Sequence, residues 1–283
     1  MGKSRSSFYL TKWHLDCIDE QGNSAIGCAA SMRWHKVEVP YTSLLLLEES
    51  KVASERSRFQ ELNWPSQMGD QIIWEDSSFG LSGWWEADAP PLTARLYHSE
   101  KGSVDWQCFQ PRSHALFDIA DGPVLKGIGY AERLVLSIEP WKIPMEQLRW
   151  GRFLSETDYV IWIELLGPAS RQWVWCNGVP VEGAIIDDET LQLPQLGLQL
   201  QLGQSVILEA EKKIFNIVHS LVDYLPGFNR AVPRFFLYAD EHKWRSRAKL
   251  MERDGVKSEG WAIHQLVDFR REAEGPRLGE LAL

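Results

Sequence analysis

The sequence has few of the features that mark proteins binding nucleic acids, membranes or metals. Its 283 residues hold 39 Asp and Glu against 30 Lys and Arg, and the net charge of −9 disfavours a phosphate-binding surface. Its richest basic stretch, 243–253, alternates with apolar residues as a strand with one solvated face does. No apolar run reaches the roughly 18 residues of a membrane-spanning helix, and the N-terminal segment lacks the apolar core of a signal peptide. We therefore expect a soluble, cytoplasmic protein with no nucleic-acid partner and no membrane span.

Motifs that hold cofactors or activate nucleophiles are also missing. We find no glycine-rich phosphate loop, no GxSxG nucleophile elbow and no HExxH pair. The cysteines, Cys17, Cys28, Cys108 and Cys176, show neither a CxxC pair nor a Cys/His spacing that suits zinc. They are expected to be buried thiols in a reducing compartment, although Cys17 and Cys28 could face each other across a hairpin. We expect no metal site and no cofactor.

Aromatic residues, in contrast, are abundant. The chain contains 14 Trp, 11 Phe and 7 Tyr, more indole than a core of this size requires. Large flat side chains suit the lining of a cavity for an apolar ligand. The alternative is that each Trp, a good strand former, simply packs between sheets.

Short segments of period-two alternation, separated by turn residues, predict an all-β sandwich or barrel. Residues 8–19 and 25–34 flank a turn-rich stretch and predict a β-hairpin. Residues 51–62 are charged enough for a loop or a short helix, and 214–225 have helical spacing after a strand. Further strands are expected at 44–47, 71–75, 81–88, 92–99, 103–110, 113–119, 127–138, 150–153, 159–166, 171–176, 191–202, 206–215, 235–238, 244–251 and 260–269.

The stretch 124–153 predicts the point where one β-structure closes and another opens. Residues 129–135 (GYAERLV) align with residues 260–266 (GWAIHQL), and each copy follows a strand centred on a Trp, Trp106 or Trp244. We therefore predict two related halves, residues 1–144 and 145–283. Each half would be a barrel or sandwich that its last strand closes, because closure removes exposed sheet edges.

The segment Gly127-Ile128-Gly129-Tyr130-Ala131-Glu132, the opening Trp13-His14-Leu15-Asp16 and the doubled β-halves resemble the hydroxyneurosporene synthase and AttH-like proteins, also called carotenoid 1,2-hydratase-like. The resemblance implies two tandem lipocalin-like, calycin-type β-barrels packed side by side, with an apolar pocket in or between them. Relatives include hydratases of carotenoid ends, cyclase-type enzymes and members without assigned activity. The chain departs from a clean hydratase pattern, because it is shorter than expected for such an enzyme and lacks a dense set of acidic residues that could protonate an alkene.

Glu132 is the strongest single catalytic candidate. Alternation places it on one strand face with Tyr130 and Leu134, so an inward orientation would bury a carboxyl group among apolar side chains. Burial raises a carboxyl pKa and keeps the group protonated, as a general acid requires. The alternative is a structural ion pair with Arg152 or Arg133.

A second candidate pair, His14 and Asp16, shares a strand face with Lys12. Residues two apart on a strand lie roughly 7 Å from each other and can act on one substrate. The alternative is an ordinary solvated strand face. His264 falls at the repeat position of Arg133, where the backbone could equally satisfy it.

Trp150 and Arg152 could place an indole and a guanidinium beside the pocket. A Trp face stabilises a cation by up to about 2 kcal/mol, enough to matter for a carbocation intermediate. Alternatively, Trp141 and Trp150 wedge the two halves together. The full set of candidates is Glu132, His14, Asp16 and Arg152 for catalysis, and Trp13, Trp85, Trp106, Tyr130 and Trp150 for ligand binding.

Two functions follow from this reading. The first is a cofactor-independent enzyme of the hydratase, isomerase or cyclase type, which transfers a proton to or from an apolar isoprenoid or polyene-like molecule. The second is a non-catalytic carrier whose cavity shields a lipid or pigment, since a lipocalin-like barrel serves either use. A weaker third is a scaffold that docks a partner through a Trp-rich surface. The sequence leaves the oligomeric state open.

Overall fold

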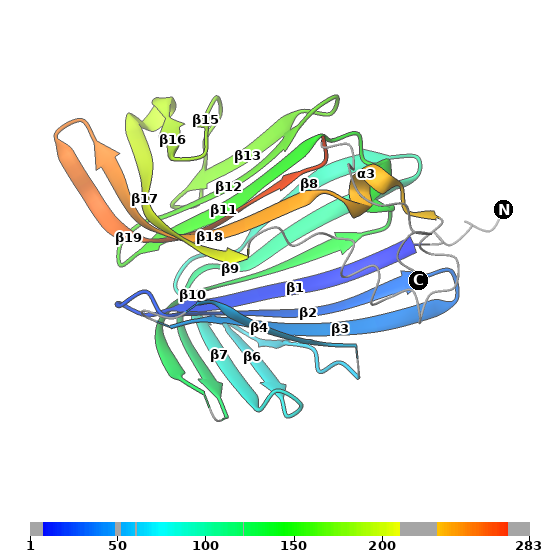
Figure 1. The fold of residues 1–283 in the computed structure, drawn as a ribbon. Helices are drawn as coiled ribbons and strands as arrows, with labels where there is room; N and C mark the ends of the chain where they lie inside the picture. Colours follow the sequence, from blue (N-terminus) through cyan, green and yellow to red (C-terminus); the bar gives the residue numbers. More distant parts are fainter. Residues whose placement is uncertain (1–7, 49–51, 60, 121, 210–230, 271–283) are drawn as a thin grey trace.

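The chain folds almost wholly into antiparallel β-structure, which confirms the predicted all-β class (Figure 1). The computed structural model describes residues 8–48, 52–59, 61–120, 122–209 and 231–270. Its strands form a 10-stranded and a 9-stranded sheet, packed one over the other. Among the described residues, no helix has the length and apolar character needed to span a membrane.

The first sheet contains β1 (Phe8–Ile18), β2 (Ser24–Trp34), β3 (Val37–Leu47), β4 (Ser54–Arg58), β5 (Ser66–Met68), β6 (Gln71–Asp76), β7 (Leu81–Ala87), β8 (Leu92–Ser99), β9 (Gly102–Ile119) and β10 (Val124–Leu136). The second contains β11 (Gln147–Ser155), β12 (Tyr159–Leu166), β13 (Arg171–Cys176), β14 (Val179–Pro180), β15 (Ile185–Ile186), β16 (Thr190–Leu193), β17 (Leu198–Glu209), β18 (Asp240–Glu252) and β19 (Gly255–Asp268). Three short helices complete the described part: the 3-10 helices η1 (Pro140–Lys142) and η2 (Pro194–Leu196), and α3 (Arg234–Leu237).

Both sheets follow the same strand order. The first runs β4-β3-β2-β1-β10-β9-β7-β6-β5, with β8 on β9, and the second runs β14-β13-β12-β11-β19-β18-β17-β16-β15. In each sheet the first strand of the half therefore pairs with a strand near its end, β1 with β10 and β11 with β19. The aligned segments of the internal repeat lie on β10 and β19, so they occupy equivalent places. The division at residues 144 and 145 stays a prediction.

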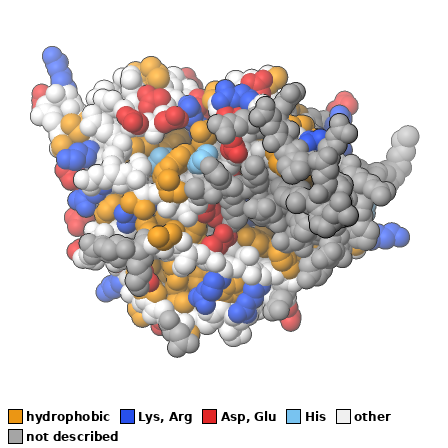
Figure 2. Space-filling view, in the orientation of Figure 1, with side chains coloured by type: hydrophobic (Ala, Val, Ile, Leu, Met, Phe, Trp, Pro, Cys, Tyr) orange, Lys and Arg blue, Asp and Glu red, His pale blue; other side chains and the backbone are white. Residues whose placement is uncertain are grey.

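Four apolar clusters of described residues hold the molecule together; one packs α3 against β3 and β19, and the other three follow the sheets. One fills the inside of the first, curled sheet and includes Trp13, Trp74 and Trp85. A second fills the inside of the other sheet, around Phe153 and Trp162. The third lies between the two sheets and draws side chains from both. Figure 2 shows hydrophobic side chains gathered on the left half of this face, between the sheets.

Glycine lets two strands approach large indoles. A Cβ atom on Gly27 of β2 would lie 2.2 Å from the Trp74 ring, which comes from β6, so the first sheet curls far enough for β6 to reach β2. In the second sheet a Cβ on Gly151 of β11 would lie 2.1 Å from Trp162. Each glycine thus makes room for an indole that a larger residue would displace.

Several local predictions are wrong, each for a physical reason. Residues 54–58 form a strand, β4, whose charged side chains suit an exposed edge. Residues 235–238 lie largely in helix α3, whose Phe236 and Leu237 are buried. Residues 103–110 and 113–119 are one strand, because a bulge against β10 accommodates Pro111.

Other predictions meet mixed outcomes. The hairpin at 8–34 is confirmed as β1 and β2. Cys17 and Cys28 do not face each other, since they pair with Ala25 and His14, and all four cysteines are buried thiols outside any disulfide. Residues 191–202 divide into β16 and β17, which pair with each other around η2. The helical spacing predicted at 214–225 lies outside the described residues.

Candidate functional site

Polar side chains from both halves meet in the layer between the two sheets. The register of β1 against β10 sets His14 opposite Glu132 and Asp16 opposite Tyr130, so these four residues share one face. Trp150 and Arg152 come from β11 of the second sheet, and Trp106 comes from β9. The structure thus brings seven of the nine predicted site residues together. We call this group the inter-sheet centre: His14, Asp16, Trp106, Tyr130, Glu132, Trp150 and Arg152.

Glu132 accepts three hydrogen bonds on one carboxylate oxygen. Trp106 Nε1 and the Tyr130 hydroxyl each donate to Oε2 at 2.5 Å, and Trp150 Nε1 donates at 3.2 Å. Burial, with the nearby Cys108 and Glu132, raises the pKa of Tyr130 well above its usual value, so this hydroxyl remains a donor. Three donors on one oxygen suit an ionised carboxylate, and Oε1 accepts from no described residue.

Asp16 and Arg152 form a fully buried ion pair that joins the two sheets. Arg152 donates from Nη2 to Oδ1 at 2.6 Å and from Nε to Oδ2 at 3.1 Å, and neither side chain is exposed to solvent. Its Nη1 donates to the carbonyl of Trp261 at 3.2 Å. Arg152 therefore pairs with Asp16 rather than with Glu132, the partner considered from the sequence.

His14 lies between the ion pair and Glu132. Its Nε2 is 3.4 Å from Asp16 Oδ2, and its ring packs edge-on against Tyr130 and Trp150. The residue is buried. An imidazole held beside a carboxylate in this way can take part in proton transfer.

Lys12 marks the open side of the inter-sheet centre. Its side chain is accessible to solvent yet surrounded by protein. Desolvation lowers the pKa of Lys12, but the negative charges of Cys28, Glu241 and Glu132 outweigh this effect, so the net pKa is raised. The ammonium therefore stays charged. Glu132 itself is half-buried, whereas the other six members of the centre are buried.

The second sheet supplies neighbours of the inter-sheet centre that were not predicted from the sequence. Trp175 of β13 stacks on Trp106 at 5.0 Å across the two sheets. Gln265 donates to Glu241 at 2.7 Å, and Lys243 donates to Glu209 at 2.6 Å. Only Gln265 had a signal in the sequence, because it lies in the repeat segment two residues beyond the counterpart of Glu132. The others depend on how the sheets face each other, which alternation within a strand does not reveal.

The structure does not place Trp13 and Trp85 in the inter-sheet centre. Both are buried inside the first sheet, where Trp13 stacks on Phe109 at 4.7 Å. Trp85 donates from Nε1 to the carbonyl of Asp16 at 2.7 Å, and so supports the centre from behind. Arg133 lies on the same far side, over the rings of Trp13 and Phe109.

His264 faces the inside of the second sheet. Its Nε2 lies 2.8 Å from the Ser246 hydroxyl, and Trp244 stacks on its ring at 5.2 Å. Burial lowers its pKa to about 4, so the imidazole is neutral near pH 7. Within the ranges that the structure describes, no three His, Cys, Asp or Glu residues cluster as a metal site would require.

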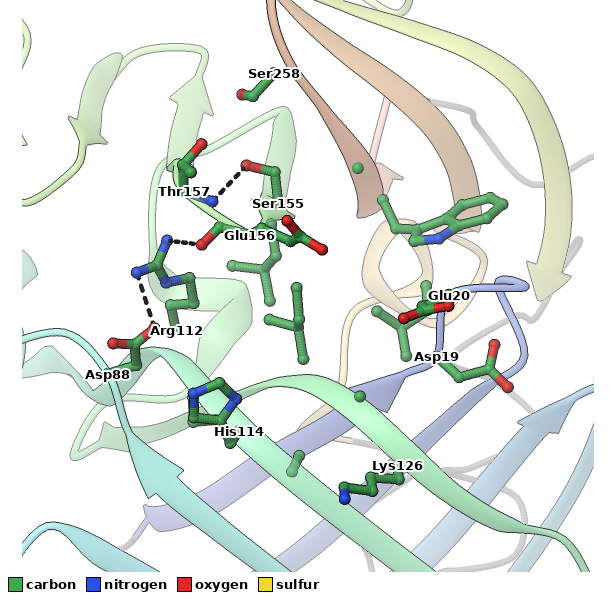
Figure 3. Close-up of a pocket in the computed structure, with 18 of the residues that line it drawn as sticks. Asp19, Glu20, Asp88, Arg112, His114, Lys126, Ser155, Glu156, Thr157 and Ser258 are labelled. Atoms are coloured by element: carbon green, nitrogen blue, oxygen red, sulfur yellow. Dashed lines mark hydrogen bonds and ion pairs between the residues drawn. The ribbon is translucent and has the colours of Figure 1, made fainter.

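A large cleft opens at the hairpin end of the same inter-sheet layer. It has a volume of about 1140 Å³ and an apolar floor of Ile18, Ile128 and Leu154. Figure 3 shows its charged rim, which includes Glu20, Glu156 and Lys126. We call it the hairpin cleft.

The hairpin cleft and Glu132 lie at different depths of the layer. Asp16, Tyr130 and Arg152 each lie two residues along the strand from a floor residue, and all three are fully buried. Glu132 lies two residues farther along β10 than Tyr130. Four residues of strand span roughly 13 Å. The cleft therefore does not reach Glu132.

Comparisons with known proteins find similarity in fold. No family model and no curated protein sequence matches the chain. The crystal structure of a candidate AttH from Nitrosomonas europaea superposes with a TM-score of 0.51 at 8% identity, covering 95% of each chain. CghA superposes with a TM-score of 0.52 at 9% identity, covering 95% of this chain and 90% of CghA. CghA with Sch210972 gives 0.51 at 9% identity, covering 92% and 88%.

These similarities confirm, at the level of fold, the resemblance to AttH-like proteins that the sequence predicted. The coverage shows that the likeness extends over both sheets rather than over one half. At 8 to 9% identity it says nothing of individual site residues.

Proposed function

We propose that the chain is a cofactor-independent enzyme that transfers a proton to or from an apolar small molecule bound between the two sheets. The reaction would be of the hydratase, isomerase or cyclase type. The observation that carries the proposal is the Glu132 carboxylate, which holds three donors on one oxygen and leaves the other open. The fold is shared with CghA, which has a structure with Sch210972, and this supports a ligand-holding role for the fold.

Glu132 would act first as a general base. The donors from Trp106, Tyr130 and Trp150 hold Oε2, so Oε1 is the atom that can take a proton from carbon or from a water molecule. From the sequence, burial alone predicted a protonated acid at Glu132, since these donors were not apparent there. After the proton has moved, the carboxylic acid can return it at another carbon, which completes an isomerisation or a cyclisation.

The remaining groups of the centre would hold or shuttle charge. His14, beside Asp16, is positioned to exchange a second proton, and Lys12 would stabilise negative charge that develops on the open side. Trp106, Trp150 and Trp175 surround the centre with buried apolar rings. An apolar ligand with a reactive double bond or an acidic C–H fits such surroundings.

The test is deuterium exchange of a bound ligand. Small molecules that co-purify with the protein are identified by mass spectrometry and then incubated with it in D₂O. We expect the wild-type protein to add one deuterium or to change the isomer. Glu132→Gln should lower this rate by at least about 100-fold, in line with the loss of a general base, and should change ligand affinity only a few-fold.

A matched control separates chemistry from charge. Glu100→Gln removes the same charge from an exposed position in the β8–β9 turn and should leave both rate and affinity unchanged. A ligand that binds wild type and Glu132→Gln equally, with no exchange in either, would identify a carrier instead of an enzyme.

A further inference from the structure

The hairpin cleft is a partly open space, separate from the inter-sheet centre. Its volume of about 1140 Å³ is at the upper end of pockets that hold small organic molecules. Beside the apolar floor, it is lined by Trp84, Leu116 and Trp261, and Leu116 keeps 37% of its surface exposed. An apolar ligand body would cover this surface.

Two contacts between the sheets fix the walls of the cleft. On one side Arg112 of β9 donates from Nη1 to the carbonyl of Glu156 in the β11–β12 turn at 3.0 Å. On the other side Arg245 of β18 donates to the carbonyl of Gly22, in the β1–β2 turn, and lies over the ring of Trp261. Because both walls are held in place without a ligand, binding carries little free-energy cost for ordering them.

Two carboxylates on opposite walls remain without an ion-pair partner among the described residues. Figure 3 shows Glu20 and Glu156 projecting toward the space between the sheets. Arg112 is close to Glu156 but binds its backbone carbonyl, and its charge is matched by Asp88 at 2.8 Å. The Glu156 carboxylate is therefore left for another cation.

Most other charged groups of the rim already have partners. Asp19 accepts from the amide of Asn23 within its own turn, and Arg247 pairs with Glu259. Lys126 is the remaining cation of the lining without a described partner, and it stands at the edge of the cleft on β10. Asp19 is held by a neutral amide and adds a third carboxylate, so the unmatched charge of the lining is three carboxylates against one ammonium, and the cleft favours a positive ligand.

We infer that the hairpin cleft binds an organic amine: a protonated ammonium between Glu20 and Glu156, attached to an apolar, preferably aromatic, body over Ile18, Ile128 and Leu154. This site is distinct from the proton-transfer site proposed at Glu132. A buried layer that contains the Asp16–Arg152 pair separates the two.

The experiment compares probes that differ only in charge. Isothermal titration calorimetry is run with 2-naphthylmethylamine, with 2-naphthalenemethanol and with 2-naphthoate at low ionic strength. We expect the amine to bind about five-fold more tightly than the alcohol and the carboxylate to bind most weakly, since partly exposed ion pairs contribute modestly. Raising the salt to 0.5 M should shrink the preference.

Variants locate the site. Glu20→Gln with Glu156→Gln should bring the ratio of amine to alcohol affinity to about one, while Glu100→Gln leaves it unchanged. Both substituted side chains are exposed, so folding is preserved. Glu132→Gln should keep the amine preference even where it abolishes deuterium exchange, so the two proposals fail separately. Equal binding of amine and alcohol, no saturable binding of either, or a preference that survives in the double variant overturns the inference.

Discussion

Asp16 and Arg152 form an ion pair from which water is excluded on both sides. Removing one member of such a pair leaves a buried charge without compensation, which typically destabilises a protein by about 3–5 kcal/mol. We expect Asp16→Asn to lower the free energy of unfolding by about that amount, because the Arg152 guanidinium would keep only the Trp261 carbonyl and a neutral amide. Urea unfolding, followed by tryptophan fluorescence, measures the change.

An exposed pair provides the control for that prediction. Arg95 and Asp105 are 2.7 Å apart, but both side chains are largely exposed. Asp105→Asn should therefore change the stability by less than about 1 kcal/mol. The double variant Asp16→Leu with Arg152→Met should be more stable than Asp16→Asn, since it leaves no unpaired charge. Equal losses in Asp16→Asn and Asp105→Asn would show that the buried pair does not hold the two sheets together.

At the scale of single strands, the second sheet depends on the absence of a side chain at Gly151. A Cβ there would lie 2.1 Å from Trp162, whose indole is almost fully buried and has little room to move. We expect Gly151→Ala to destabilise the protein by about 1–3 kcal/mol through overpacking. Thermal unfolding monitored by circular dichroism should show a lower midpoint.

Gly203 is the matched position, because it also lies within a strand of the second sheet. A Cβ at Gly203 would meet only the Arg247 carbonyl, at 3.7 Å. Gly203→Ala should therefore be close to neutral or slightly stabilising, since alanine restricts the unfolded chain. If both alanine variants unfold at the wild-type temperature, Trp162 does not pack as tightly as its contacts indicate.

Turn residues in the sequence locate elements even where both faces of a strand are buried. The hairpin of β1 and β2 is buried on both faces over most of its length, and from its turn it was predicted within a residue or two. Helix α3 was not, because four apolar residues, 235–238, fit a buried strand and a buried helix equally well. Strand β4 lies at the edge of the first sheet, and its charged, exposed residues led to the prediction of a loop or short helix.

At the scale of the whole molecule, alternation of apolar and polar residues does not predict which residues of the two sheets contact each other. Alternation correctly grouped His14 with Asp16 and Glu132 with Tyr130. It could not show that β11 brings Arg152 to Asp16, because this contact spans 136 positions and two sheets. Inside the first sheet, Trp13 and Trp85 were predicted to bind a ligand, but they belong to a packed core rather than to the lining of a cavity.

The stability of the whole chain should decrease in two stages on acidification. His264 has its pKa lowered by burial from 6.5 to about 4. Between these values the unfolded chain binds a proton that the folded chain does not, so stability is lost as the pH falls from 6.5 to 4, by up to about 3 kcal/mol. Urea unfolding at pH 7, 5.5 and 4 measures this stage. His264→Gln should remove it, and His98→Gln, at an exposed position, should not.

The second stage belongs to carboxylates. Desolvation raises the pKa of Asp158, but hydrogen bonds from Lys257 and Asn177 outweigh it and lower the pKa to about 2. A hydrogen bond from Arg270 does the same for Asp268. For both groups the stability present above pH 3.8 is lost as the pH falls toward 2. A His264→Gln variant should therefore lose the first stage and keep the second, whereas a decline with the wild-type slope between pH 6.5 and 4 would show that His264 already carries a proton in the folded state.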